Sequence, residues 1–144
     1  MFTSIIVAID GSKQSSEALA AAISLAGLTG GHLCLITVPQ PIIVPVIDGT
    51  MSYPMPYSQD DLDRDAKATL DAALSSVPDG LKTRTVTNIL YGDPAHCIVE
   101  KATEIGADLI VLGRRGLGTF TGLLLGSTTT KVGQLAPCAV LTVK

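Results

Sequence analysis

Residues 108–128 constrain the fold of this chain more than any other segment. The continuous apolar run at 109–112 predicts a fully buried strand, and a short helix is expected to begin near Ser127. Glycine lets a backbone approach a ligand closely, and a helix start offers unpaired N–H groups and a positive dipole end. The segment therefore predicts a phosphate-binding connection in an α/β protein, with the spacing Gly113-x2-Gly116-x9-Gly126-Ser127.

Two common phosphate-binding loops do not match this spacing. A P-loop needs a lysine directly before its Ser or Thr, whereas here Leu125-Gly126 precedes Ser127. A dinucleotide fingerprint needs three glycines in the first strand-to-helix turn, where this chain has Gly11 alone. From the residues alone, a plain connection with Ser127 as the N-cap of the next helix stays open as an alternative.

Composition favours one α/β domain spanning residues 1–144. Hydrophobic residues make up 47% of the chain and aromatic residues 3%, and the mean hydropathy is +0.44. Aliphatic residues in this proportion are typical of a parallel sheet covered by helices on both faces. No apolar run reaches the roughly 18 residues of a membrane span, so membrane insertion is not expected. The N-terminus has no basic region before its apolar stretch and predicts a strand.

Charge and cysteine content exclude further classes. The net charge of −3 argues against a nucleic-acid partner. Three cysteines far apart in the sequence predict buried, reduced thiols and a cytoplasmic location. We interpret both histidines as structural, because no metal-ligand spacing joins them to the cysteines. These residues are Cys34, Cys97, Cys138, His32 and His96.

The order of expected elements is β-α-β-α-β-α-β-α-β. Right-handed crossovers make this a single doubly wound, five-stranded parallel sheet of order 3-2-1-4-5 with helices on both faces. Ligands bind such sheets at the switch point, here between strands one and four, so Asp10 and Gly113 should meet at one crevice. The sequence further predicts a turn at Pro78-Asp79-Gly80. The expected strands cover 4–9, 33–38, 83–90, 108–112 and 138–143, and the expected helices start at Ser12, Asp60, Asp93 and Ser127.

Residues 39–58 interrupt this alternation. Five of the eight prolines lie here, which excludes a helix or a central strand. The segment is also too apolar for a disordered linker. We expect it to pack over the crevice; the alternative is a loop that binds a partner.

The whole chain resembles the universal stress protein family. The resemblance includes the strand ending in Asp10-Gly11-Ser12, the Gly92-Asp93-Pro94 turn, residues 107–113 and the close at residues 137–141. It also includes the glycine spacing that runs from Gly113 to Ser127. The resemblance implies an adenine-nucleotide alpha-hydrolase-like fold and a regulatory stress-response protein that binds ATP.

The resemblance also implies a set of site residues. Asp10 is expected beside the nucleotide and its Mg²⁺, directly or through water, and the backbone of Val38 beside adenine. The end of strand two, residues 36–39, departs from the His-Val of many family members, and Pro39 there has no N–H to offer to adenine. From the residues alone, a turn-forming acid at Asp10 and a solvated cation at Arg114 stay open as alternatives, and the glycine spacing opposite Asp10 favours its ligand role. The implied ATP-binding set is Ala8, Asp10, Gly11, Ser12, Val38, Gly113, Arg114, Gly116, Gly126, Ser127 and Thr128.

No catalytic constellation can be assembled around the expected crevice, so we expect no enzyme beyond slow ATP hydrolysis. The uncharged edge strand at 138–143 predicts a homodimer paired through strand five. A regulatory protein is a further expected partner. The alternative function is a nucleotide-free homodimeric interaction module that uses the apolar loop 39–58.

Overall fold

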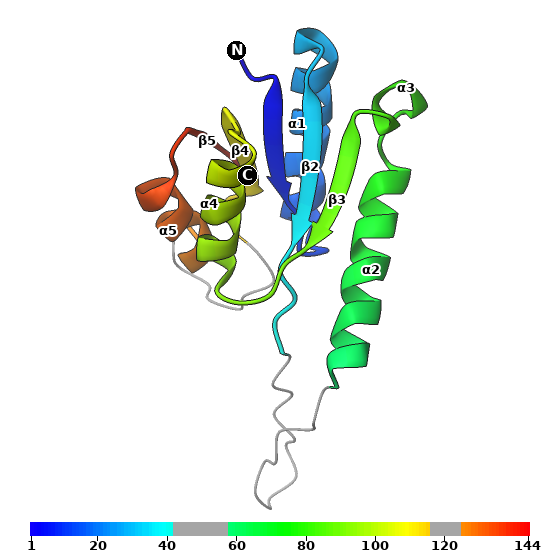
Figure 1. The fold of residues 1–144 in the computed structure, drawn as a ribbon, viewed down its shortest axis with the longest axis vertical. Helices are drawn as coiled ribbons and strands as arrows, with labels where there is room; N and C mark the ends of the chain where they lie inside the picture. The colour runs from blue at the N-terminus through cyan, green and yellow to red at the C-terminus, as the bar shows by residue number, and fades with distance from the viewer. Residues whose placement is uncertain (42–57, 116–124) are drawn as a thin grey trace, which may run out of the picture.

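A computed structural model describes residues 1–41, 58–115 and 125–144. Its five strands form one parallel sheet of order β3-β2-β1-β4-β5 (Figure 1), as the sequence predicts. The elements are β1 (Ser4–Ala8), α1 (Lys13–Thr29), β2 (His32–Thr37), α2 (Gln59–Ser75), α3 (Asp79–Lys82), β3 (Thr85–Ile89), α4 (Pro94–Glu104), β4 (Leu109–Gly113), α5 (Ser127–Leu135) and β5 (Ala139–Val143).

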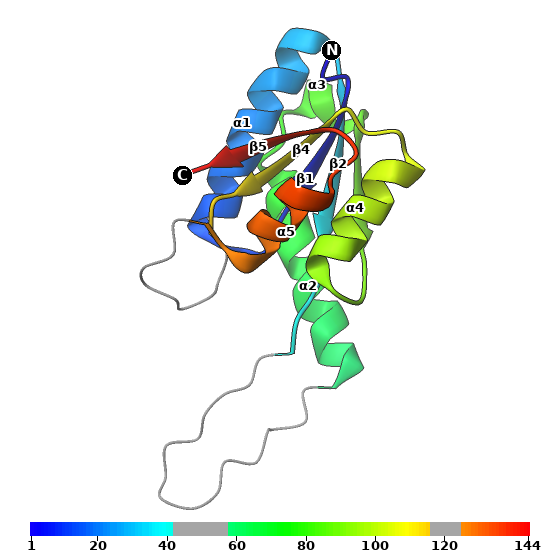
Figure 2. The ribbon, with the colours of Figure 1, turned by 90° about the vertical axis from the view of Figure 1, so that its left-hand side faces the viewer.

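The helices cover both faces of the sheet. Helices α1 and α2 pack on one face and α4 and α5 on the other, as the two perpendicular views show (Figures 1 and 2). This division follows from right-handed crossovers, because the chain moves outward from β1 to β3 and then returns to β4 and β5. The direction reverses between β1 and β4, which is therefore the switch point.

Side chains of the central strands alternate between the two cores. Val7 points toward α1 and α2, and its neighbour Ile6 points toward α4 and α5; both are completely buried. Strand β3 lies at the edge of the sheet, and its Val86 is 59% exposed. The apolar runs of β1, β2 and β4 thus belong to central strands, as expected for a sheet buried on both faces.

Three helix ends match their sequence signals. Ser12 caps α1, and its side chain accepts a hydrogen bond from the Ser15 N–H. Gly30 ends α1 in the left-handed conformation. Asp93 caps α4, and Pro94 takes the first helical position.

One local prediction and one alternative are wrong. Residues 78–80 do not form an isolated turn, because the Pro78 carbonyl accepts from the N–H groups of Leu81 and Lys82 and starts the short helix α3. Helix α5 begins at Ser127, as the sequence predicts, so the alternative in which Ser127 is the N-cap is wrong. Gly126 is the N-cap, and its carbonyl accepts the N–H of Thr130.

The cysteine prediction is correct for one residue of three. Cys34 is buried in β2, and burial raises the pKa of its thiol. Cys97 and Cys138 are free thiols too, but both are partly exposed. Their apolar neighbours in the sequence suggested burial. Both are partly exposed because Cys97 lies at the flank of α4 and Cys138 precedes the edge strand β5.

Most of the proline-rich segment, residues 42–57, lies outside the described residues, and so does the expectation that it packs over the crevice. Within the described ranges, no helix combines the length and the apolar character needed to cross a membrane.

Candidate functional site

The carboxyl ends of three central strands meet at one edge of the sheet. The register pairs Ala8 with Ile36 and Val7 with Val111, so β1, β2 and β4 end at nearly the same level. Asp10, Val38 and Arg114 follow these strand ends. The structure therefore brings together the segments that the sequence analysis selected separately, at the lower edge of the sheet in Figure 1.

The turn from β1 to α1 is held by its own side chains. The N–H of Ser12 donates to Asp10 Oδ1 at 2.9 Å, which closes an Asx turn. Gly11 between them has φ +81°, a conformation that L side chains rarely adopt. Asp10 therefore has a turn-forming role, and the same turn holds its carboxylate at the end of β1.

Hydrogen bonds hold the two ends of the connection from β4 to α5 together. The N–H of Gly126 donates to the carbonyl of Arg114 at 2.9 Å, so the segment returns to the point where it left the sheet. Thr129, which is buried, donates its hydroxyl to the Gly113 carbonyl at 3.0 Å. These two bonds hold the N-terminus of α5 against the end of β4.

Two glycines of the motif occupy different surroundings. A Cβ at Gly113 would stand 2.7 Å from Gln14 Cβ and 3.0 Å from the Arg115 carbonyl, so glycine is required there for packing against α1. A Cβ at Gly126 would meet no atom closer than 3.6 Å. These separations are ordinary van der Waals contacts, so the fold of the described residues does not require glycine at 126. Gly116 lies outside the described residues.

The first turn of α5 presents polar groups at this edge. Ser127 is exposed and Thr128 is partly buried, and both carry hydroxyls. The first N–H groups of a helix have no acceptor within the helix, and the dipole makes this end positive. Arg114 is partly buried beside it. The arrangement suits an anion such as phosphate.

The end of β2 forms the other side of the site. Val38 is partly buried and packs against the core beneath α4 and α5, as does Ala8 at the end of β1. After Pro39, the Gln40 side chain donates to the Pro39 carbonyl at 3.0 Å and to the Gly92 carbonyl at 3.2 Å.

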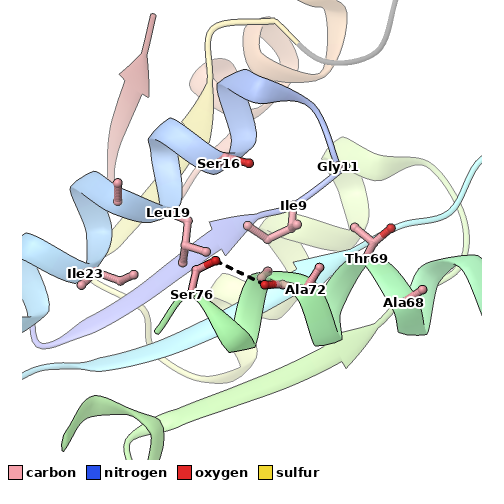
Figure 3. A pocket seen from close by; sticks show the side chains of 11 residues that line it. Ile9, Gly11, Ser16, Leu19, Ile23, Ala68, Thr69, Ala72 and Ser76 are labelled. Atoms are coloured by element: carbon pink, nitrogen blue, oxygen red, sulfur yellow. Dashed lines mark hydrogen bonds between the residues drawn. The ribbon is translucent and has the colours of Figure 1, made fainter. Parts of the chain in front are cut away.

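A separate groove lies between α1 and α2 (Figure 3). Its cavity has a volume of about 560 Å³ and reaches Gly11 at one end. Small residues form both walls, and buried apolar side chains form its floor. Figure 3 labels the wall residues Ser16, Ala68, Ala72 and Ser76 and the floor residues Ile9 and Leu19. This groove shares only Gly11 with the candidate nucleotide site, among the described residues.

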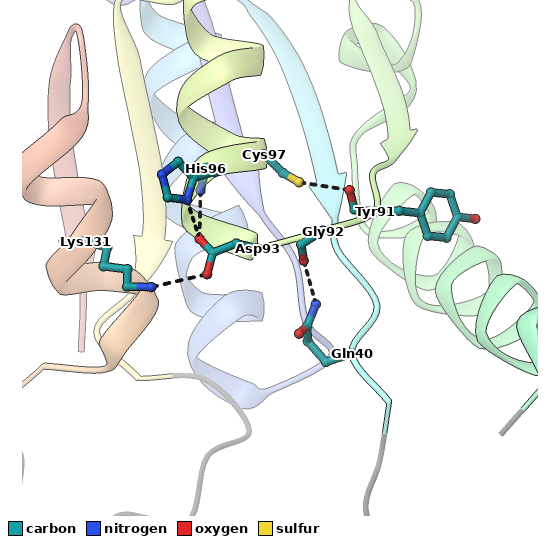
Figure 4. A network of polar contacts seen from close by, with 7 residues as sticks. All are labelled: Gln40, Tyr91, Gly92, Asp93, His96, Cys97 and Lys131. Atoms are coloured by element: carbon teal, nitrogen blue, oxygen red, sulfur yellow. Dashed lines mark hydrogen bonds and ion pairs between the residues drawn. The ribbon is translucent and has the colours of Figure 1, made fainter. Parts of the chain in front are cut away.

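Polar contacts around the turn between β3 and α4 were missed by the sequence analysis (Figure 4). Asp93 Oδ1 accepts from the N–H of His96 at 3.1 Å and lies 3.0 Å from His96 Nδ1, while Oδ2 lies 3.2 Å from Lys131 Nζ. These contacts, led by the backbone N–H of His96, lower the pKa of Asp93 to about 2. The carboxylate is therefore ionised at neutral pH and links α4 to α5.

Within the described ranges, no cluster of three or more His, Cys, Asp or Glu side chains could hold a metal ion alone. A magnesium ion at the strand ends would need ligands from the phosphates of a nucleotide as well as from Asp10. The residues therefore fit a metal that arrives with a nucleotide better than a resident metal.

Comparison with known proteins identifies the family of this chain. The family model described as the universal stress protein family matches residues 1–144. This chain belongs to the universal stress protein family. Universal stress protein YxiE of Bacillus subtilis is 33% identical to it over 150 residues, with both chains fully covered.

Solved universal stress proteins share the fold of this family member. The protein UspA from Lactobacillus plantarum superposes with a TM-score of 0.74 at 26% identity, covering 99% of this chain and 98% of the other. A universal stress protein in complex with cAMP gives a TM-score of 0.66 at 28% identity and covers 97% and 95% of the two chains. The second structure shows that a relative of this protein binds an adenine nucleotide.

Proposed function

We propose that this universal stress protein is a cytoplasmic regulatory protein that binds ATP with Mg²⁺ at the carboxyl edge of its sheet. The observation that carries the proposal is the start of α5. Two hydrogen bonds hold this helix end at the switch point, and packing among the described residues does not require the glycine at 126. Helix N-termini bind phosphate groups through their unpaired backbone N–H groups and the positive end of the helix dipole. The cAMP complex of a relative supports an adenine nucleotide as the ligand.

Each strand end has a distinct role in this proposal. The backbone of Val38 lies beside adenine, the β1–α1 turn with Asp10 beside the ribose and the metal, and the α5 end beside the phosphates. Pro39 offers no N–H, so the backbone groups of Val38 contact the edge of adenine. Binding regulates the protein, and hydrolysis is slow compared with nucleotide exchange. Accumulation of ADP within the lifetime of the complex would contradict this last point.

Titration calorimetry with a matched pair of variants tests the proposal. Gly126→Ala adds a methyl group where phosphate approaches, and Gly133→Ala adds the same group to α5 at a position where no atom lies within 4 Å. We expect Gly126→Ala to lower ATP affinity by on the order of tenfold and Gly133→Ala to leave it unchanged. Absence of an ATP isotherm for the unmodified protein, or equal affinity in both variants, would reject the site.

We also propose that two copies pair through β5. This strand lies at the sheet edge and carries no charged residue, so its unpaired backbone groups favour association about a two-fold axis. Val140 packs against the core, whereas Thr142 is exposed, so Thr142→Lys is the cleaner test. Sedimentation should show a dimer for the unmodified protein and a shift toward monomer for Thr142→Lys. A monomeric unmodified protein would exclude this pairing.

A further inference from the structure

The turn between β3 and α4 contacts three separate parts of the molecule. The hydroxyl of Tyr91 donates to Asp63 in α2 at 2.5 Å. The carbonyl of Gly92 accepts from Gln40, and the carboxylate of Asp93 contacts Lys131 (Figure 4). The last two contacts reach the two sides of the candidate nucleotide site.

The contact with Gln40 reaches the adenine side. Gln40 lies two residues after Val38, in the segment that leaves the end of β2. Its side-chain nitrogen is 3.2 Å from the Gly92 carbonyl and 3.0 Å from the Pro39 carbonyl. This pair of bonds restricts the segment just beyond the residue proposed to lie beside adenine.

The contact with Lys131 reaches the phosphate side. Lys131 is one helical turn beyond Ser127, in the same short helix whose first N–H groups face the proposed phosphates. Its Nζ lies 3.2 Å from Asp93 Oδ2. Asp93 is itself fixed, because its Oδ1 caps α4 through the N–H of His96. The ion pair therefore connects the start of α4 to α5.

We infer that Gly92 and Asp93 form a positioning turn for the nucleotide site, although neither contacts the nucleotide. Asp93 orients the start of α5 through Lys131, and the Gly92 carbonyl orients the end of β2 through Gln40. The inference rests on the proposed function. The competing explanation is that Lys131 binds phosphate directly and that its contact with Asp93 holds the lysine away from the ligand.

Removing the charge of Asp93 separates these explanations, because they predict opposite changes in ATP affinity. Asp93→Asn keeps an oxygen to cap α4 but weakens the contact with Lys131. If Asp93 positions α5, ATP affinity falls even though a negative charge has been removed. If Lys131 binds phosphate directly, the same change frees the lysine, and ATP affinity rises. The ion pair is exposed, so we expect a fall of about two- to fivefold.

Calorimetry on a double-mutant cycle provides the test. We expect Asp93→Asn and Lys131→Met each to weaken ATP binding, and the double variant to be no weaker than either single one, because both remove the same contact. Lys131→Arg keeps the charge and should retain most of the affinity. Additive losses, or a gain for Asp93→Asn, would overturn the positioning role.

Adenosine provides a readout that general destabilisation would not produce. Because adenosine lacks phosphates, its affinity should be unchanged in Asp93→Asn and Lys131→Met. Gln40→Ala acts on the other side of the site and should weaken adenosine and ATP by the same factor. Equal loss of both ligands in the Asp93 and Lys131 variants would contradict the assignment of this pair to the phosphate side.

Failure of the proposed function is recognised separately. If the unmodified protein binds neither ATP nor adenosine, the proposed function is wrong, and amide hydrogen exchange then decides whether the turn still orders α5. Faster exchange across 130–135 in Lys131→Met than in Lys131→Arg supports the connection. Identical exchange in the two variants overturns it. If the unmodified protein binds ATP and every variant binds equally well, the inference alone is wrong.

Discussion

Thr129 donates its hydroxyl to the carbonyl of Gly113, so a buried side chain in the first turn of α5 closes onto the last residue of β4. The bond length is 3.0 Å. Gly113 is in turn pressed against the first turn of α1, where Gln14 leaves no space for a Cβ. The starts of α1 and α5 are therefore both held against the end of β4.

Replacing Thr129 by valine should lower both stability and ATP affinity. The valine has nearly the same shape but leaves the Gly113 carbonyl without the hydroxyl donor, a loss of about 1–3 kcal/mol in the free energy of unfolding. Urea denaturation measures the first effect and calorimetry the second. Thr130→Val is the control, because the Thr130 hydroxyl is exposed and donates within its own helix. Equal effects of the two substitutions would show that the hydrogen bond from Thr129 to Gly113 contributes no more to stability or ATP affinity than the exposed Thr130 hydroxyl does.

Replacing Asp10 by asparagine should separate the metal from the turn. Asparagine retains an oxygen that can accept the Ser12 N–H, so the Asx turn and the melting temperature should be preserved. The lost charge should weaken Mg-ATP while leaving metal-free ATP unchanged or slightly tighter. Calorimetry with and without magnesium measures the difference. Equal losses under both conditions would remove Asp10 from the metal site.

Stability in acid should reveal the contacts of Asp93. Its pKa is lowered from 3.8 to about 2, first by the backbone N–H of His96 and then by the imidazole and Lys131. A lowered carboxyl pKa contributes stability that is complete above about pH 3.8 and is lost as the pH falls through about 2.

The urea midpoints of the unmodified protein and Asp93→Asn should therefore differ most above pH 4 and converge toward pH 2. Asp65→Asn, on the exposed side of α2, provides a comparison for the general effect of removing one carboxylate. A difference between the unmodified protein and Asp93→Asn that stayed constant over this range would show that protonation of Asp93 is not responsible.

Filling the groove between α1 and α2 should stabilise the protein. Ala72 lines the groove and is exposed, so leucine at this position can cover the apolar floor without displacing neighbours. We expect Ala72→Leu to raise the free energy of unfolding by about 1 kcal/mol, the value of roughly one additional buried methylene. Ala66→Leu, on the buried side of the same helix, should destabilise by about 1–3 kcal/mol through overpacking. Thermal unfolding of both variants measures the contrast.

The fold and the meeting of the site segments could be predicted because each depends on a local pattern repeated along the chain. Continuous apolar runs identify central strands, and the order of elements with right-handed crossovers fixes the sheet. Once that order is known, Asp10 and Gly113 must share one edge. The caps Ser12 and Asp93 could be predicted for the same reason, since a cap acts within three residues of its own position.

Other features depend on contacts between distant segments, and the sequence did not reveal them. Gly113 was interpreted as a phosphate-binding glycine, whereas the structure shows that it is first required by Gln14 of α1. Lys131 and Asp93 are 38 residues apart, and no local pattern relates them. The hydroxyl run at 127–130 was a signal for Thr129, but only the packed helix distinguishes the buried hydroxyl from its exposed neighbours.

The hydrogen bond between Gly126 and Arg114 gives the candidate site a modular construction. Its two residues close the connection between β4 and α5, so the ends of the intervening segment are fixed whatever its length. The free energy of closing a loop changes by only about 0.6 kcal/mol when its length doubles. Segments of different length and composition can therefore be exchanged between Arg115 and Leu125 while the sheet and α5 keep their positions. If the proposed function is correct, ligand preference would then change with this segment alone, as an exchangeable cassette, while the domain that carries it stays the same.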